Sequence, residues 1–203
     1  QKVLLKCGFV RVGDKVEHGK TLCRFVSYNP DYIETKRLRM FPLTPHHLRI
    51  YLEADDKFEQ LFGLSPFGRI VVPAVRERVE KLSLPGIEAA PPHLRVFHTF
   101  WLAVEKSSNT VVAELGFKGA PDAAGRVEIG YGTMPFQQGR GIMTEAVGGF
   151  VDWVSRRNDV RSILAETDRA NAASIRILEK NNFTQYTMKG NMLWWEKEIK
   201  TPG

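Results

Sequence analysis

A glycine-rich segment, Gln-Gly-Arg-Gly at 138–141, lies between a predicted strand and a predicted helix. Glycine lets the backbone approach a ligand closely, and the first turn of a helix presents unpaired N–H groups with positive partial charge. Together these features favour an anion such as a pyrophosphate. The segment is not a Walker motif, because no Gly-Lys-Ser or Gly-Lys-Thr follows, and it departs from G-x-G-x-x-G at Thr144. Taken alone, it is equally compatible with an ordinary tight turn.

The elements around this segment predict a parallel crossover. The stretch 126–134 has strand composition but contains Gly130 and Gly132, which indicates a bulge or a close backbone approach. An amphipathic helix is expected after position 141, since Ala146, Val147 and Phe150 share one face. A β-rich stretch follows at 162–167. The order strand, turn, helix and strand requires two parallel strands joined by the helix.

The rest of the chain predicts a mixed α+β fold with mostly antiparallel strands. Thr44 before Pro45 predicts a helix start, and the spacing of Val75, Val79 and Leu82 predicts a helical stripe. The prolines of 84–93 predict a loop. The other expected elements are a strand at 37–42, a short helix at 56–62, a hairpin at 96–104 and 110–117, a helix at 171–180 and a hairpin at 183–187 and 192–199.

Composition narrows the class of protein. The 203 residues are 43% hydrophobic and 26% charged, which is typical of a globular chain of one domain with an appendage. There is no long apolar run and no secretory signal pattern, and the two cysteines cannot form a disulfide framework, so we expect a cytoplasmic protein without a membrane partner. The net charge of +6 is spread along the chain, and no nucleic-acid-binding motif accompanies it. His46 and His47 lack a third ligand for a metal.

Four stretches, in this order, resemble the GCN5-related N-acetyltransferase (GNAT) superfamily, in particular its branch of ribosomal-protein-alanine acetyltransferases. The resemblance runs from about Thr35 to Ile199, and its motifs lie at 35–44, 127–131, 138–146 and 171–183. Met143 stands where the acyl-CoA motif usually has Gly or Ala, and Asn182 replaces the usual Gly before Phe183. Asparagine tolerates a left-handed helix cap, so the fold should be retained.

The resemblance implies the GNAT fold, with a bulged central strand and flanking helices. It also implies transfer of an acetyl group from acetyl-CoA to a primary amine of a small molecule or a protein N-terminus, by direct attack in a ternary complex and without a metal. The alternative is a non-catalytic acyl-CoA-binding or interaction module of a tandem protein. Loss of Gln138, Gly141 or Asn171 would favour that alternative, and all three are present.

The resemblance also assigns roles to residues. Because an ammonium is not a nucleophile, a base must first remove a proton; Glu128 is the candidate, with a surface or arginine-paired carboxylate as the alternative. Glu145 fits a first-turn residue that favours the helix dipole. Ser174 would protonate the leaving thiolate or simply cap its helix, Tyr186 is a weaker candidate acid, and a backbone N–H near Tyr131 or Gly132 would stabilise the oxyanion. The expected acyl-CoA-binding residues are Met134, Gln138, Gly139, Arg140, Gly141, Ile142, Met143, Thr144, Asn171 and Ser174.

Residues 1–30 resemble the C-terminal tail of a second GNAT domain, and residues 31–203 form the GNAT domain itself. The stretch 3–9 is similar to 177–183, and 19–22 is similar to 190–193. We expect a chain cut from a tandem protein, which the absence of an initiator Met fits, with its tail docked on this domain or on a second chain. A homodimer or a contact with a preceding domain would follow. The acceptor stays open, and the segment between Phe62 and Val96 is expected to shape its pocket.

Overall fold

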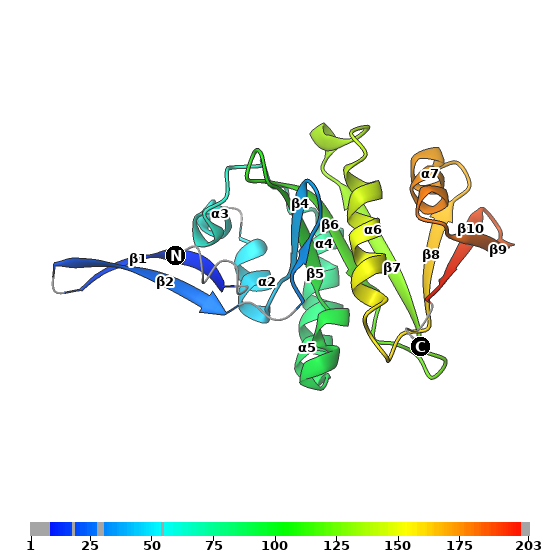
Figure 1. The fold of residues 1–203 in the computed structure, drawn as a ribbon, viewed down its shortest axis with the longest axis horizontal. Helices are drawn as coiled ribbons and strands as arrows, with labels where there is room; N and C mark the ends of the chain where they lie inside the picture. Colours follow the sequence, from blue (N-terminus) through cyan, green and yellow to red (C-terminus); the bar gives the residue numbers. More distant parts are fainter. Residues whose placement is uncertain (1–8, 18, 28–30, 54, 200–203) are drawn as a thin grey trace.

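The computed structural model describes residues 9–17, 19–27, 31–53 and 55–199, and places the strands in two sheets (Figure 1). β1 (Phe9–Glu17) and β2 (Lys20–Ser27) form a separate hairpin. The main sheet has the order β3-β4-β5-β6-β7-β8-β10-β9. Its strands are β3 (Ile33–Glu34), β4 (Leu38–Pro42), β5 (Phe100–Glu105), β6 (Thr110–Phe117), β7 (Arg126–Thr133), β8 (Ser162–Asp168), β9 (Thr184–Lys189) and β10 (Met192–Glu198).

Helices cover both faces of the main sheet. They are α2 (Pro45–Tyr51), α3 (Lys57–Phe62), α4 (Pro73–Arg78), α5 (Leu84–Ala89), α6 (Ile142–Val154) and α7 (Ala172–Lys180), with a π-helical turn η1 (Val79–Ser83) and 3-10 turns η2 (Pro92–Phe97) and η3 (Pro135–Gln137). All neighbouring strands are antiparallel except β7 and β8, which are parallel and joined through α6. The predicted α+β class and the single parallel crossover are therefore confirmed.

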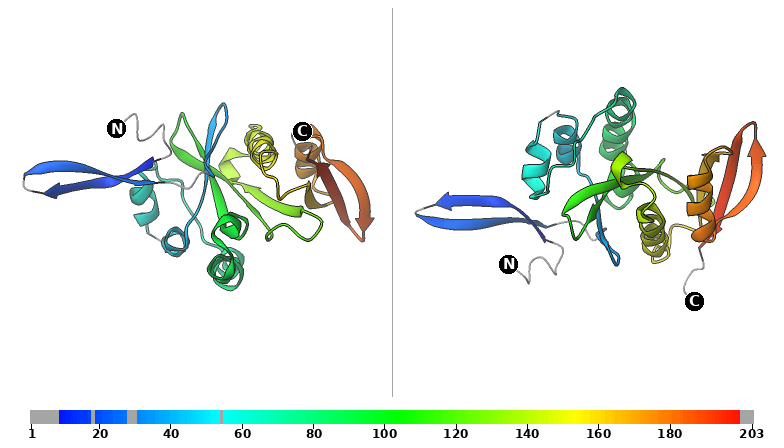
Figure 2. Two further views of the ribbon diagram at one scale, coloured as in Figure 1. Left: turned by 60° about the horizontal axis from the view of Figure 1, so that its bottom comes forward. Right: turned by 90° about the horizontal axis from the view of Figure 1, so that it is seen from above.

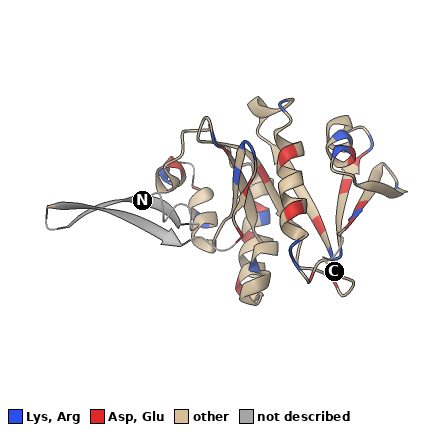
Figure 3. Ribbon diagram, viewed as in Figure 1, with Lys and Arg blue, Asp and Glu red and all other residues tan. Residues whose placement is uncertain are grey.

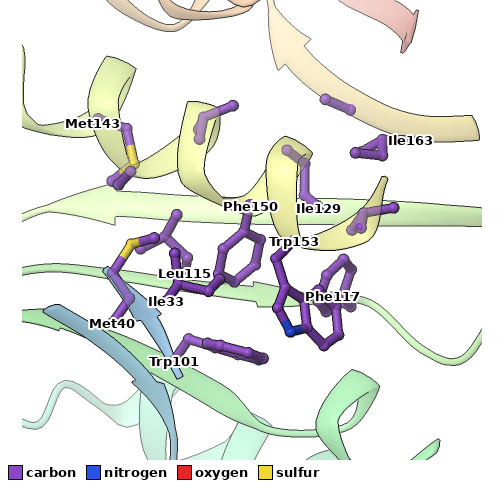
Figure 4. Packing of buried hydrophobic residues seen from close by; sticks show 14 of the residues in the cluster. Ile33, Met40, Trp101, Leu115, Phe117, Ile129, Met143, Phe150, Trp153 and Ile163 are labelled. Atoms are coloured by element: carbon purple, nitrogen blue, oxygen red, sulfur yellow. The ribbon is translucent and has the colours of Figure 1, made fainter. Parts of the chain in front are cut away.

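Side chains of β5 alternate between two hydrophobic cores because successive residues of a strand face opposite sides. Trp101 faces the core under α6, whereas Phe100 and Leu102 face the core under α2 to α5. Figure 2 shows α6 and the group α2–α5 on opposite sides of the sheet. In the first core the Trp101 ring lies 5.0 Å from Phe150 and 5.2 Å from Trp153 between ring centroids, both edge-to-face (Figure 4). This packing holds α6, and hence its N-terminal loop, against the strands.

The segment predicted to be a loop at 84–93 is mostly helical. α4, η1 and α5 form one continuous helical stretch, and Pro85 is accepted there because it lies in the first turn of α5. The π-helical turn inserts extra backbone, which changes the direction of the following side chains. As a result Val79 is buried as predicted, but Leu82 is 62% exposed and Ser83 is buried in its place.

The bulge predicted in β7 is absent from its ladder with β6, which runs in register from Phe117↔Ile129 to Ala113↔Thr133. What distinguishes β7 is its other edge, where pairing with β8 stops at Ile129↔Ala165. A register shift occurs instead between β5 and β6, at Ala103 and Val104. The glycines at 130 and 132 therefore lie where β7 leaves β8.

The N-terminal hairpin resembles the C-terminal one in its connection. In β1–β2 the pair Glu17↔Lys20 closes a two-residue turn that includes Gly19, and in β9–β10 the turn that starts at Gly190 has the same length. Both glycines have left-handed φ, +72° and +59°. The hairpin predicted within 1–28 is thus observed, and β1 contacts α3. The helix expected at 3–9 lies almost wholly outside the described residues, and the origin of this segment in another domain stays a prediction.

The start of α2 carries a buried histidine, His47, that links stability to pH. Thr44 caps the helix by accepting from the His47 backbone N–H, and His47 Nδ1 accepts from the Thr44 N–H. Burial, and then the charge of His46, lower the pKa of His47 to about 4. The unfolded chain, with a pKa near 6.5, binds this proton more readily, so the folded state loses stability as the pH falls from 6.5 towards 4.

We expect His47→Gln to remove part of this pH dependence. At pH 5 the wild type should lose about 2 kcal/mol more unfolding free energy, relative to pH 7.5, than the variant does. Urea unfolding at both pH values measures the difference. His93→Gln, at an exposed histidine, is the control and should behave like the wild type. An equal pH dependence in all three proteins would contradict the prediction.

Candidate functional site

The site is built where the two parallel strands separate. β7 and β8 pair from Arg126↔Ser162 to Ile129↔Ala165, and beyond this point β7 pairs only with β6 and β8 only with β10. Figure 1 shows the two strands diverging towards their carboxyl ends. Ligands of sheets with parallel strands bind at such an opening outside the carboxyl ends. The glycine-rich segment and α7 both lie at this opening.

A cavity of ≈ 530 Å³, here called the loop cavity, occupies this opening. It brings together most of the residues that the sequence predicted for acyl-CoA binding. Those that line it are Gln138, Gly139, Gly141, Ile142, Met143, Thr144, Asn171 and Ser174. Residues that were not predicted for acyl-CoA binding also line it, namely Tyr131 and Gly132, which were expected near the oxyanion, and Thr133, Gln137, Ala173, Arg176, Ile177 and Lys180. Met134 and Arg140 are the two predicted residues that do not.

The loop before α6 has the conformation that glycine permits. Gly139 and Gly141 have φ values of +74° and +71°, in the left-handed region that other residues rarely adopt. Gly141 is the N-cap of the 13-residue helix α6, and no side chain caps it. The N–H groups of the first turn therefore lack the usual side-chain acceptor and lie beside the loop cavity. With the helix dipole, these donors are suited to an anion, and binding of an anion there stays a prediction.

Arg140 holds the loop rather than lining the cavity. Its Nη2 donates to Glu105 Oε1 at 2.7 Å, and Glu105 is buried at the end of β5. Its backbone carbonyl accepts from Arg37 Nη1 at 2.9 Å. Met134 is turned to the second core, and its N–H donates to Val112 O. Both predicted residues thus fix the loop to the sheet.

Glu145 also helps to hold the start of α6 against the sheet. One carboxylate oxygen accepts from Thr35 Oγ1 and from the Arg37 N–H, each at 2.6 Å, and the other accepts from Arg37 Nε at 2.6 Å. Burial raises the pKa of this carboxyl, but these donors together hold it below the ordinary value. The carboxylate anchors the first turn of α6 to the β3–β4 connection. The sequence suggested only that it would interact with the helix dipole.

Helix α7 places a hydroxyl pair and two basic residues at the loop cavity. Asn171 caps the helix, with its Oδ1 accepting from the Ser174 N–H at 3.0 Å. The Ser174 and Tyr131 hydroxyl oxygens are 2.9 Å apart. Burial raises the pKa of Tyr131. Arg176 and Lys180, spaced i and i+4, line the cavity, and α7 carries basic residues in Figure 3; the sequence reasoning missed them, although this spacing on an expected helix was a usable signal.

A second cavity of ≈ 340 Å³, here called the lid cavity, lies under α4 on the other side of β7. Apolar side chains make most of its wall, and Arg78 and Glu114 are its charged residues. Tyr131 and Gly132 line both this cavity and the loop cavity. The end of β7 is therefore the partition across which two ligands, one in each cavity, could react.

Glu114 is a carboxylate that the sequence reasoning missed. It lies on β6, and its Oε1 accepts a hydrogen bond from the Tyr51 hydroxyl. Burial raises the pKa of Glu114, partly offset by this hydrogen bond, and burial also raises the pKa of Tyr51. A carboxylate with a raised pKa in a cleft is a candidate base. An isolated Glu in a strand gave no sequence signal, because only the fold brings Tyr51 and the cavity to it.

Glu128 and Tyr186, two of the predicted catalytic residues, line neither cavity. The Glu128 carboxylate forms an ion pair with Lys118, whose Nζ also lies 3.3 Å from Glu166. Glu128 precedes the point where β7 and β8 separate, so its side chain lies at the closed end of the opening. Tyr186 is 50% exposed on the edge strand β9. Glu128 is thus paired with a lysine, whereas the alternative drawn from the sequence was a surface or arginine-paired carboxylate.

Two further observations concern the described part of the chain. Within residues 9–17, 19–27, 31–53 and 55–199, three or more His, Cys, Asp or Glu residues nowhere gather as they would around a metal ion. In the same ranges, no helix has the length and apolarity needed to cross a membrane.

Comparisons with known proteins agree with this geometry. A family model described as "Acetyltransferase (GNAT) domain" matches residues 37–184. An uncharacterised N-acetyltransferase, YjdG of Bacillus subtilis (strain 168), is 34% identical over 83 residues, which are 41% of this chain and 49% of the relative. The match thus spans about half the length of this curated relative.

Solved structures show the same fold at low sequence identity. RimL, a ribosomal L7/L12 alpha-N-protein acetyltransferase in complex with coenzyme A, superposes with a TM-score of 0.57 at 16% identity, over 83% of this chain and 98% of that one. The ribosomal-protein-S5-alanine acetyltransferase of Vibrio fischeri superposes with a TM-score of 0.57 at 16% identity, over 83% of this chain and 96% of that one. A GNAT-family acetyltransferase of Bacillus anthracis superposes with a TM-score of 0.56 at 14% identity, over 83% of this chain and 98% of that one.

Proposed function

Since this chain belongs to the family of GNAT acetyltransferases, we propose that it transfers an acetyl group from acetyl-CoA, bound in the loop cavity, to a primary amine in the lid cavity. One observation carries the proposal: the two cavities lie on opposite sides of β7 and share Tyr131 and Gly132. Two substrates held this way meet at a partition made of one strand, and proximity of this kind supplies a large part of the rate of a two-substrate reaction.

The loop cavity suits acetyl-CoA at both ends of that molecule. The left-handed glycines and the uncapped first turn of α6 favour the pyrophosphate. Arg176 and Lys180 add positive charge for the phosphates. Asn171 and Ser174 also line the cavity and are the groups proposed to contact the pantetheine arm and the thioester.

The chemistry requires three groups around the thioester. Glu114 accepts a proton from the acceptor ammonium, and the neutral amine nitrogen attacks the thioester carbonyl carbon. Beyond Ile129 the outer edge of β7 no longer pairs with β8, so its N–H groups there are available to the oxyanion. When the C–S bond breaks, the thiolate takes a proton from the Ser174 hydroxyl, which Tyr131 supports by hydrogen bonding. The nitrogen gives up its second proton to solvent, and solvent returns a proton to Ser174. The products are an amide, CoA with a free thiol, and one proton released to solvent.

Calorimetric titration with CoA and with acetyl-CoA, followed by a thiol-release assay with a panel of amines, tests this function. Micromolar binding together with amine-dependent thiol release would support it. Binding without release by any amine would favour a non-catalytic acyl-CoA-binding module. Absence of binding at high concentration would contradict both.

Removing the basic residues of α7 should weaken CoA binding in a graded way. A hydrogen bond to a charged group is worth about 1.5–3 kcal/mol, so Arg176→Ala and Lys180→Ala are each expected to raise the Kd of CoA by about tenfold or more. Titration at fixed ionic strength measures this. Arg169→Ala, at an exposed arginine before α7 that lines neither cavity, is the matched control. Equal affinities in all variants would remove α7 from the proposed phosphate site.

A further inference from the structure

The lid cavity contains two charged groups of opposite sign. Glu114 and Arg78 line it together with the apolar side chains of Val75, Phe100 and Leu115. Among the residues that the structure describes, neither charged group forms an ion pair. Charges in a partly apolar cleft that do not pair with each other favour a ligand that carries the opposite charges.

Arg78 differs in this respect from two arginines that precede it in the chain. Arg69 is paired with Glu59, and Arg76 with Glu80 in the next turn. Arg78 Nη2 donates to the Phe117 carbonyl at 3.2 Å, and its guanidinium carbon lies 5.6 Å from the centre of the Phe100 ring. These contacts position a half-buried guanidinium at the cavity wall. A guanidinium has five N–H donors and binds a carboxylate with two of them at once.

We infer that the acceptor is a free α-amino acid with an apolar side chain, whose ammonium faces Glu114 and whose carboxylate faces Arg78. This inference rests on the proposed function. The volume of ≈ 340 Å³ lies at the lower end of the range for small-molecule sites. A polyamine fits less well, because its second positive charge would face the positively charged Arg78. The first residue of a peptide lacks the free carboxylate that the guanidinium would bind. The apolar wall receives the side chain.

The test compares acceptors that differ only in the carboxylate. Thiol release is measured with acetyl-CoA and with apolar and aromatic amino acids, their amides, the corresponding decarboxylated amines such as phenethylamine, and tripeptides that start with the same residue. For the wild type we expect kcat/KM of the best free acid to exceed that of its amide by about 100-fold, because an unpaired buried polar group in the site penalises the analogue.

Arg78→Met should lower kcat/KM for the free acid by about 100-fold and leave phenethylamine unchanged. Arg78→Lys keeps the positive charge but not the planar pair of N–H donors, so its kcat/KM for the free acid should lie between the values of the wild type and Arg78→Met. Arg76→Met, at the neighbouring arginine outside the cavity, is the matched control. A merely structural effect of Arg78 would lower the rates for acid and amine together, and thermal melting of each variant checks folding.

Several results would overturn the inference. One is that amides or tripeptides react as well as free acids. Another is that Arg78→Met lowers kcat/KM equally for all acceptors. A third is that calorimetry detects no binding of these amino acids to the CoA-saturated protein. The proposed function fails by a different result, namely absence of acetyl-CoA binding. If acetyl-CoA binds and other amines react, only the acceptor assignment is lost.

Discussion

Glu114→Gln is expected to reduce kcat by about 100- to 10,000-fold, the range that a general base contributes. The amide has nearly the shape of the carboxylate and can still accept from the Tyr51 hydroxyl, but it cannot take a proton from an ammonium. Because Glu114 lines the lid cavity and not the loop cavity, the Kd for acetyl-CoA should stay within about twofold of the wild-type value. Single-turnover kinetics and calorimetry measure the two effects separately.

Glu128→Gln is the matched control, because it makes the same chemical change on the neighbouring strand. Its carboxylate is paired with Lys118 and lines neither cavity, so turnover should change less than about threefold. A large loss in Glu128→Gln with no loss in Glu114→Gln would assign the base to Glu128 and contradict the proposal.

The pH profile supplies a further test of Glu114. Burial raises its pKa above the ordinary value of 4.5. The base must be ionised, so kcat/KM should rise with pH through this raised pKa and then level off. The Tyr51 hydrogen bond lowers the pKa, so Tyr51→Phe should move the acid limb to higher pH. The folded state also binds this proton more tightly than the unfolded chain, so the contribution of Glu114 to wild-type stability should fall as pH rises above 4.5, and this contribution is absent in Glu114→Gln. An unchanged acid limb in Tyr51→Phe would argue against Glu114.

Gly141→Val should abolish most of the acyl-CoA affinity. Gly141 has a φ of +71°, which costs a β-branched residue about 1–2 kcal/mol. The added side chain would project towards Arg37 Nη2, 3.7 Å from the new Cβ, beside the cavity. Relief of the strain requires the loop to turn, and the first-turn N–H groups of α6 then turn away from the phosphates. Losing two charge-assisted hydrogen bonds of about 1.5 kcal/mol each raises Kd by about 100-fold.

Gly63→Val is the matched control for this change. Gly63 is the left-handed C-cap of α3, with φ of +61°, and has open space around its Cβ position. It should lose a similar amount of stability, measured by urea unfolding, while the Kd for CoA stays unchanged. If both variants lost affinity to the same extent, general destabilisation would explain the effect, and the glycine loop would not be the phosphate site.

Local patterns in the sequence were sufficient for the elements that follow from short-range physics. The helix start at Thr44 and the helices expected at 56–62 and 171–180 are all observed, and their caps depend on residues within one turn. The glycine loop and the amphipathic face of α6 were predicted for the same reason. The main failure, the helical stretch at 84–93, came from prolines that a π-helical turn and a first-turn position accommodate.

The tertiary structure alone decided which residues meet. Tyr51 and Glu114 are 63 positions apart, and Tyr131 and Ser174 are 43 apart. Both pairs exist because the fold brings together strands and helices from different parts of the chain. The same packing removed Glu128 from the site, because β7 and β8 separate just after it and Lys118 reaches its carboxylate. The sequence by itself thus determined the family motifs and the glycine-rich loop, whose geometry is local. The proposed base, the lid cavity and its two opposite charges depend on contacts across the sheet, which a single sequence does not encode in any short pattern.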